Sequence, residues 1–143
     1  MTDFPDHFFR GITSSKWVHD DGSVDPQAFQ PYTSDSRSDG GQEISINWDD
    51  DEPALTFTLT QRNDKGHLMF QAGVVQLPRS ECDRINSSPA YSSMLYYERD
   101  DPPNINNPYH GNIVLHTSLL KHHIRSIQGA LAIASSKVIT RAK

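Results

Sequence analysis

Residues 109–138, YHGNIVLHTSLLKHHIRSIQGALAIASSKV, place a predicted strand directly before the longest predicted helix of the chain. The strand covers residues 109–116. From Thr117 or Ser118 onward, apolar side chains recur at the spacing of a helix with one buried stripe, namely Leu120, His123 or Ile124, Ile127, Leu131, Ala134 and Val138. Lys137, Arg141 and Lys143 lie near the predicted helix end, where the helix dipole favours cations. Because such a stripe has to be buried, we expect this helix to cover one face of a sheet.

Three further segments predict the rest of that sheet. In EISINW, residues 43–48, apolar and polar side chains alternate with the period of a half-buried strand. ALTFTLTQ, residues 54–61, shows the same alternation, and the turn-like RNDKG after it predicts a hairpin with residues 67–77 as antiparallel partner. SMLYYE, residues 93–98, also reads as a strand.

Short helices are predicted where capping residues precede compact turns. Ser14 or Ser15 starts one, and Asp25 followed by Pro26 starts a second, because proline lacks the N–H that would stay unbonded there. Residues 78–86 predict a brief helix capped by Ser80. With no regular alternation of strands and helices, the order of elements predicts one α+β domain over residues 1–143, with a mainly antiparallel curved sheet, short N-terminal helices and a long C-terminal helix packed on one face.

Composition narrows the classes of partner and compartment. The 143 residues carry a formal net charge of −5 and no basic run, which makes nucleic acid an unlikely main partner. Cys82 is the only cysteine, which excludes an internal disulfide and a cysteine-rich zinc site. No apolar run approaches the roughly 20 residues of a membrane helix. We therefore expect a cytoplasmic protein without a membrane segment, a bound metal or a cofactor.

Two histidines, His110 and His116, share one face of the predicted strand with Asn112. In a straight strand their side chains start about 20 Å apart, too far for a common metal ion or a direct proton relay without a bend at Gly111. His110 follows a proline-containing loop, a place where functional side chains often lie. A structural or solvent-facing role and a catalytic role are both open for it.

Arg10 lies inside the apolar segment FFRGI, residues 8–12. A buried arginine needs a paired acceptor or a bound anion. The segment resembles the first conserved segment of ADP-ribosyltransferase-like domains, in which an arginine after an aromatic residue begins a dinucleotide pocket. By order along the chain, the resemblance implies that Ser45 and Glu98 complete that site. The alternative is an arginine paired with an acid at the sheet edge.

A second resemblance spans most of the chain in short patches. The R-x-I start at residues 10–12, the G-x-V-x-x-x-A-F segment at residues 22–29, a serine-containing strand and the N-P-x-H-x-x-I motif at residues 107–113 are similar to a set of small uncharacterised bacterial proteins. Those proteins have no settled activity. The resemblance implies a shared fold and a shared placement of Arg10, Ser45 and His110.

These observations lead to hypotheses of different classes. The first is a cytoplasmic bacterial protein-interaction module, an accessory or immunity-like component of a toxin or defence system, whose acidic surface binds a basic protein partner. The second is an enzyme, ADP-ribosyltransferase-like or of another kind, that acts on a small phosphate-bearing nucleotide ligand through Arg10, Ser45, His110 and Glu98. In that site arginine would hold phosphate and histidine would move a proton.

A third hypothesis, an RNA-associated protein that stacks bases on tyrosines, is weaker because of the acidic balance. The tyrosines concerned are Tyr91, Tyr96, Tyr97 and Tyr109.

Overall fold

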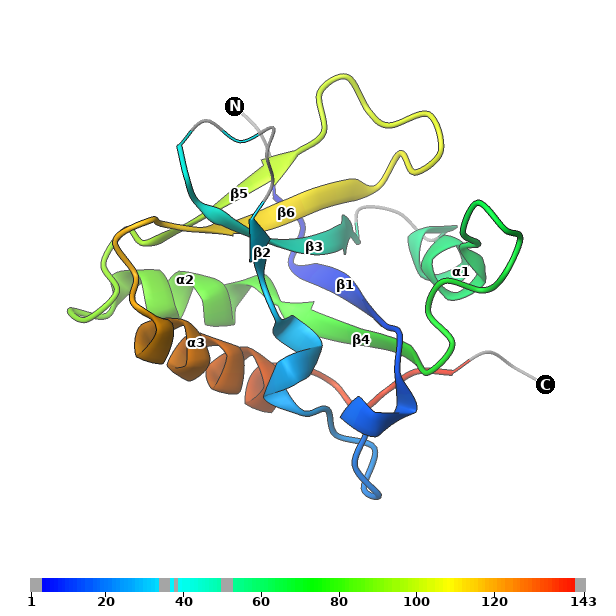
Figure 1. Cartoon of the computed structure of the whole chain (residues 1–143), viewed down its shortest axis with the longest axis horizontal. Helices are drawn as coiled ribbons and strands as arrows, with labels where there is room; N and C mark the ends of the chain where they lie inside the picture. Colours follow the sequence, from blue (N-terminus) through cyan, green and yellow to red (C-terminus); the bar gives the residue numbers. More distant parts are fainter. Residues whose placement is uncertain (1–3, 34–36, 38, 50–52, 141–143) are drawn as a thin grey trace.

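The computed structural model describes residues 4–33, 37, 39–49 and 53–140 (Figure 1). Its strands are β1 (His7–Ile12), β2 (Tyr32–Thr33), β3 (Gln42–Trp48), β4 (Gly73–Pro78), β5 (Leu95–Arg99) and β6 (His110–Leu115). Its α-helices are α1 (Pro53–Thr60), α2 (Arg79–Ser87) and α3 (Lys121–Ala134), and two short 3-10 helices are η1 (Ser15–Trp17) and η2 (Pro26–Phe29). Within these residues, no helix has the length and apolar character needed to cross a membrane.

One antiparallel sheet organises the domain, with the strand order β4-β1-β3-β6-β5 and β2 paired to β3. The sheet is open, and α3 follows the last strand as its pattern predicts. The predicted α+β class with a mainly antiparallel sheet and a C-terminal helix is therefore confirmed. The central strand β3 has β1 on one side and β6 on the other, so it joins the two segments that carry Arg10 and His110.

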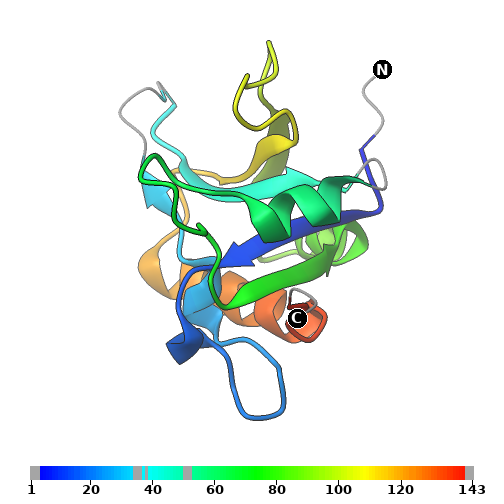
Figure 2. The ribbon, with the colours of Figure 1, turned by 90° about the vertical axis from the view of Figure 1, so that its right-hand side faces the viewer.

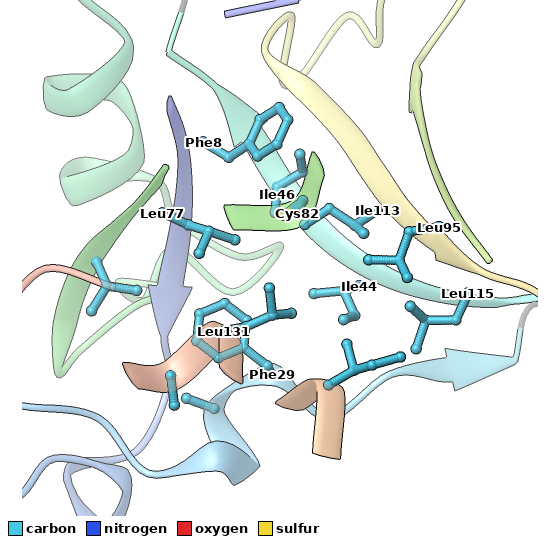
Figure 3. Packing of buried hydrophobic residues seen from close by; sticks show 14 of the residues in the cluster. Phe8, Phe29, Ile44, Ile46, Leu77, Cys82, Leu95, Ile113, Leu115 and Leu131 are labelled. Carbon is cyan, nitrogen blue, oxygen red and sulfur yellow. The ribbon is translucent and has the colours of Figure 1, made fainter. Parts of the chain in front are cut away.

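Successive side chains of each strand point to opposite faces of this sheet. On one face, the isoleucines and tryptophan of β3 enter the main core, which also includes Phe8 of β1, Phe29 of η2 and Leu131 of α3 (Figure 3). On the opposite face, Phe9 packs with Ala54 of α1 in a smaller cluster. Figure 2 shows α1 and α3 on opposite sides of β1 and β4. The face under α1 is only partly covered.

The predicted strand over residues 54–61 is wrong, because residues 53–60 form α1. Pro53 is the first residue of the helix, where a missing N–H costs nothing. The hydroxyl groups of Thr58 and Thr60 donate to the carbonyl groups four residues earlier, at 2.8 and 2.7 Å, so the threonines bond within the helix. The predicted hairpin is wrong as well, since β4 pairs with β1.

The predicted short helices form, with small differences at their ends. Ser14 caps η1 and Asp25 caps η2, whereas α2 begins at Arg79, one residue before the predicted cap Ser80. α3 ends at Ala134, and residues 136–139 instead run along the free edge of β4 through the Val74–Ile139 bridge. Lys137 and Val138 thus lie beyond the helix, and Arg141 and Lys143 lie outside the described residues.

Candidate functional site

A pocket of about 790 Å³ opens on the sheet face that carries α1. Its floor is formed by β1 and β3, one wall by the segment after α1, and the other wall by the segment between β5 and β6. The residues that line it include Phe9, Arg10, Gly11, Ser45, Ile46, Asn47, residues 61–64, Met69, Phe70, Asp100, Asn104, Asn106, Asn107 and His110. The lining combines apolar side chains such as Phe9, Met69 and Phe70 with convergent polar groups, and convergent polar groups in a pocket are typical of small-molecule sites.

Arg10 lies where the pairing of β1 with β3 ends. The paired residues are Phe8 with Trp48 and Phe9 with Asn47, and Arg10 is the next residue of β1. Its Nε donates to the carbonyl oxygen of Ala28 at 3.0 Å, and its NH1 donates to that of Ser45 at 2.7 Å. Burial lowers the pKa of Arg10 to about 10. Among the described residues, no carboxylate oxygen lies within 4.0 Å of this guanidinium. Its positive charge therefore meets two neutral acceptors and no protein anion there.

His110 forms the start of β6 and is held by Asp100. The imidazole Nδ1 lies 2.8 Å from Oδ2 of Asp100, and both side chains are about 30 % exposed, at 27 % and 31 %. The backbone N–H of Asp100 also donates to the carbonyl oxygen of His110. The ring position is thus fixed by β6 and by the residue that directly follows β5.

Ser45 and Asn47 are two residues apart on β3, so their side chains point to the same face of the sheet. Asn47 is paired directly with His110. The hydroxyl group of Ser45 is 3.2 Å from the hydroxyl group of Tyr32 and 3.5 Å from Oδ1 of Asn112. Ser45 lines the pocket, and its carbonyl oxygen binds Arg10. It therefore joins the arginine to the polar side chains of the next strand.

Asn47 connects three parts of the pocket. Its amide nitrogen donates to Oγ1 of Thr58 in α1 at 2.8 Å, and its amide oxygen accepts from Nδ2 of Asn107 at 2.9 Å. Asn107 in turn accepts from the backbone N–H of Tyr109. Asn47 and Asn107 are both buried. This network attaches α1 and the segment that leads to His110 to the central strand.

Glu98 does not line the pocket. It binds Arg37, and it accepts from Nδ2 of Asn112 at 3.2 Å. Arg37 also pairs with Glu43 at 2.9 Å and with Asp39 at 3.5 Å. The structure therefore brings Arg10, Ser45 and His110 to one pocket and places Glu98 in a neighbouring ion-pair network.

The two histidines of β6 lie in different settings. His116 follows the strand at its other end, where its Nδ1 accepts from the backbone N–H of Ser118 at 3.1 Å, and it is not among the residues that line the pocket. Of the two histidines, only His110 therefore belongs to the site.

Gly111 lies directly after His110 in β6. A Cβ atom at this position would come within 2.1 Å of Nε1 of Trp48, so no larger residue fits there without a shift.

The tyrosines of the RNA hypothesis do not form one surface. Tyr91 and Tyr97 pack against the main core, and Tyr109 packs beside the cluster under α1. Tyr96 is exposed, and its hydroxyl group donates to Asp39. Base stacking on these four rings together is not supported by this arrangement.

Sequence reasoning missed Asp100, Asn47 and Asn107. Asp100 stands in a loop with a second aspartate beside it, and only the β5–β6 register shows which one meets His110. Asn47 is one of the polar side chains in the alternating pattern of residues 43–48, and its burial follows from α1, which the pattern does not predict. The N-P-x-H motif did contain one signal, because Asn107 is its first residue.

Comparison with protein-family models, with curated proteins and with solved structures finds no match to this chain. The similarity to ADP-ribosyltransferase-like domains and to small bacterial proteins stays a prediction. Among the described residues, no group of three or more His, Cys, Asp or Glu side chains is arranged to hold a metal ion.

Proposed function

We propose that the protein binds a small phosphate-bearing ligand, such as a nucleotide, in the pocket beside β1, β3 and β6, and acts on it as an enzyme. The observation that carries this proposal is Arg10, a residue of the pocket lining whose buried guanidinium has no carboxylate partner among the described residues. A buried charge that is not neutralised by the protein is costly. A ligand anion in the pocket would supply the missing negative charge.

The dimensions and chemistry of the pocket support a nucleotide-sized ligand. Small-molecule sites commonly measure roughly 300–1,000 Å³, and this pocket measures about 790 Å³. Arg10 would bind phosphate, for which the planar guanidinium is well suited. The hydroxyl group of Ser45 and the imidazole of His110 would lie beside the bound ligand, where the hydroxyl group can donate a hydrogen bond and histidine can transfer a proton.

Glu98 is a weaker part of this proposal. Its carboxylate is engaged by Arg37 and Asn112, so a role on the ligand would require it to leave that network. We therefore propose Arg10, Ser45 and His110 as the ligand-contacting residues. The ADP-ribosyltransferase-like mechanism, which needs Glu98, is one form of the proposal that a Glu98→Gln variant tests separately.

Thermal unfolding with added pyrophosphate tests the binding proposal. A ligand at about ten times its dissociation constant stabilises the folded state by about 1.4 kcal/mol, which for a chain of this size raises Tm by roughly 3–6 °C. We expect this shift in the wild type and in Arg84→Gln, a matched variant at an exposed arginine of α2 that does not line the pocket. We expect no shift in Arg10→Gln.

An equal shift in Arg10→Gln, or none in the wild type at millimolar pyrophosphate, contradicts the proposal. Arg10 also binds two backbone carbonyl groups, so its replacement can weaken the fold. Ligand-induced changes in the backbone amide spectrum of the wild type at residues 10, 45 and 110 then give a measurement that does not need the variant.

We also propose, as a second candidate, the cytoplasmic interaction module of a bacterial toxin or defence system that binds a basic protein. Two observations favour it: the net charge of −5, and Ile105, whose side chain is 95 % exposed in the segment between β5 and β6. Capture of a partner that weakens as salt rises, and that fails with Ile105→Ser, supports this candidate. Binding that is indifferent to both changes contradicts it.

A further inference from the structure

The hydrogen bonds of His110 and His116 fix opposite tautomers of the two rings. A carboxylate oxygen can only accept, so Nδ1 of His110 has to carry the proton that it donates to Asp100 over 2.8 Å. The backbone N–H of Ser118 can only donate, so Nδ1 of His116 has to be the unprotonated nitrogen. In the neutral state, Nε2 is therefore a base in His110 and an N–H donor in His116.

We propose that Asp100 and His110 form the proton-accepting pair of the pocket. The inference rests on the proposed function, because it concerns the ligand of the same site. A hydroxyl group of the ligand, or a water molecule bound with it, passes its proton to Nε2 of His110. The ring becomes an imidazolium, and the carboxylate of Asp100 stabilises the new charge through Nδ1–H. Asp100 acts through the histidine and is a positioning residue.

The charges around this ring fit that role. The charged side chains that line the pocket with His110 are Arg10 on β1, Arg62 and Asp64 on the wall after α1, and Asp100 beside the ring. Among the described residues, Nε2 has no hydrogen-bond partner that would compete with a ligand. Protonation of His110 adds a positive charge to a pocket that already holds Arg10 and Arg62, so a phosphate group and the proton would bind together.

The first test needs no ligand. Long-range proton–nitrogen NMR on the nitrogen-15-labelled full chain at about pH 8.5, where free imidazole is neutral, distinguishes the two tautomers of each ring. We expect the Nδ1–H form for His110 and the Nε2–H form for His116. Asp100→Asn should change the spectrum of His110 and leave that of His116 as it was. An Nε2–H form of His110 in the wild type overturns the inference.

The second test is the uptake of protons on pyrophosphate binding, measured by calorimetry near neutral pH in two buffers with different ionisation enthalpies. We expect the wild type and His116→Gln to take up more protons per ligand than His110→Gln, by a measurable fraction of a proton, and Asp100→Asn to take up less than the wild type. Uptake that is unchanged in His110→Gln overturns the inference while the binding proposal stands. The absence of any binding by the wild type, with the expected tautomers present, contradicts the proposed function instead.

Discussion

The amide pair Asn47–Asn107 offers the sharpest test of how the pocket is built. Asn47→Ala leaves the buried Nδ2 of Asn107 without its acceptor and removes the donor to Oγ1 of Thr58. Leaving a buried polar group unpaired costs about 1–3 kcal/mol. The hydroxyl group of Thr58 keeps its own bond to the carbonyl oxygen of Ala54. Losing the bond from Asn47 to Thr58 should therefore cost less than losing the bond between the two amides. We expect Asn47→Ala to lower the free energy of unfolding by about 2–4 kcal/mol.

A double-mutant cycle isolates the bond between the two amides. Asn107→Ala alone should cost about 1–3 kcal/mol, because it leaves the amide oxygen of Asn47 unpaired and frees the N–H of Tyr109. Once one partner is missing, removing the second costs less, so we expect a coupling of at least about 1 kcal/mol. Urea unfolding followed by tryptophan fluorescence gives each value, provided that the urea dependence of the free energy stays constant.

Asn106→Ala is the matched control for this cycle. Its side chain is exposed in the same segment, and we expect a change within about 0.5 kcal/mol. The reasoning is refuted if Asn47→Ala costs less than about 1 kcal/mol, or if the two single changes add within about 0.3 kcal/mol in the double variant.

Three further outcomes follow from the packing and the charges. Gly111→Ala should destabilise the fold by about 1–3 kcal/mol or more, because the new Cβ would lie 2.1 Å from a buried indole nitrogen and 2.5 Å from a backbone oxygen. Gly129→Ala should stabilise the fold by about 1 kcal/mol, because this helical position has no neighbour within 4 Å. A thermal melt in which Gly111→Ala is the more stable of the two variants contradicts this account. Burial raises the pKa of Cys82 to about 12, so a thiol reagent at about pH 8 should label the chain only after denaturation, and fast labelling of the native protein would show that the thiol is accessible. Arg37→Gln should cost about 3 kcal/mol, because it leaves the buried carboxylate of Glu43 without its cation. Arg84→Gln removes an exposed ion pair and should leave the midpoint of the same urea transition nearly unchanged.

The strands at residues 43–48 and 109–116 could be predicted because period-two alternation follows from the geometry of a sheet. Residues 54–61 show the same alternation and still form a helix. Leu55 and Leu59 are four residues apart. Side chains at this spacing lie on the same face of a strand and also on the same face of a helix, so the pattern allows both structures. What decided the outcome was Pro53 at the helix start and the contact of Ala54 with Phe9, and the second of these is a tertiary contact.

The candidate site could be predicted in part for a comparable reason. Arg10 is conspicuous as a charge in an apolar segment, and its position predicted a buried guanidinium that needs an acceptor. Neither of its acceptors could be predicted, because both are backbone carbonyl groups that depend on where β1 leaves β3. The partner of His110 is likewise fixed by the register of β5 with β6.

The central claim is that the pocket holds a phosphate-bearing ligand beside Arg10. The most direct test is an NMR titration of the isotope-labelled full chain with pyrophosphate, in which each backbone amide and the Arg10 guanidinium are followed. The account predicts saturable changes at the Arg10 Nε–H and at the amides of Gly11, Ser45 and His110. Changes confined to residues 121–125, the basic first turns of α3 away from the pocket, or no saturable change at the pocket, would contradict it.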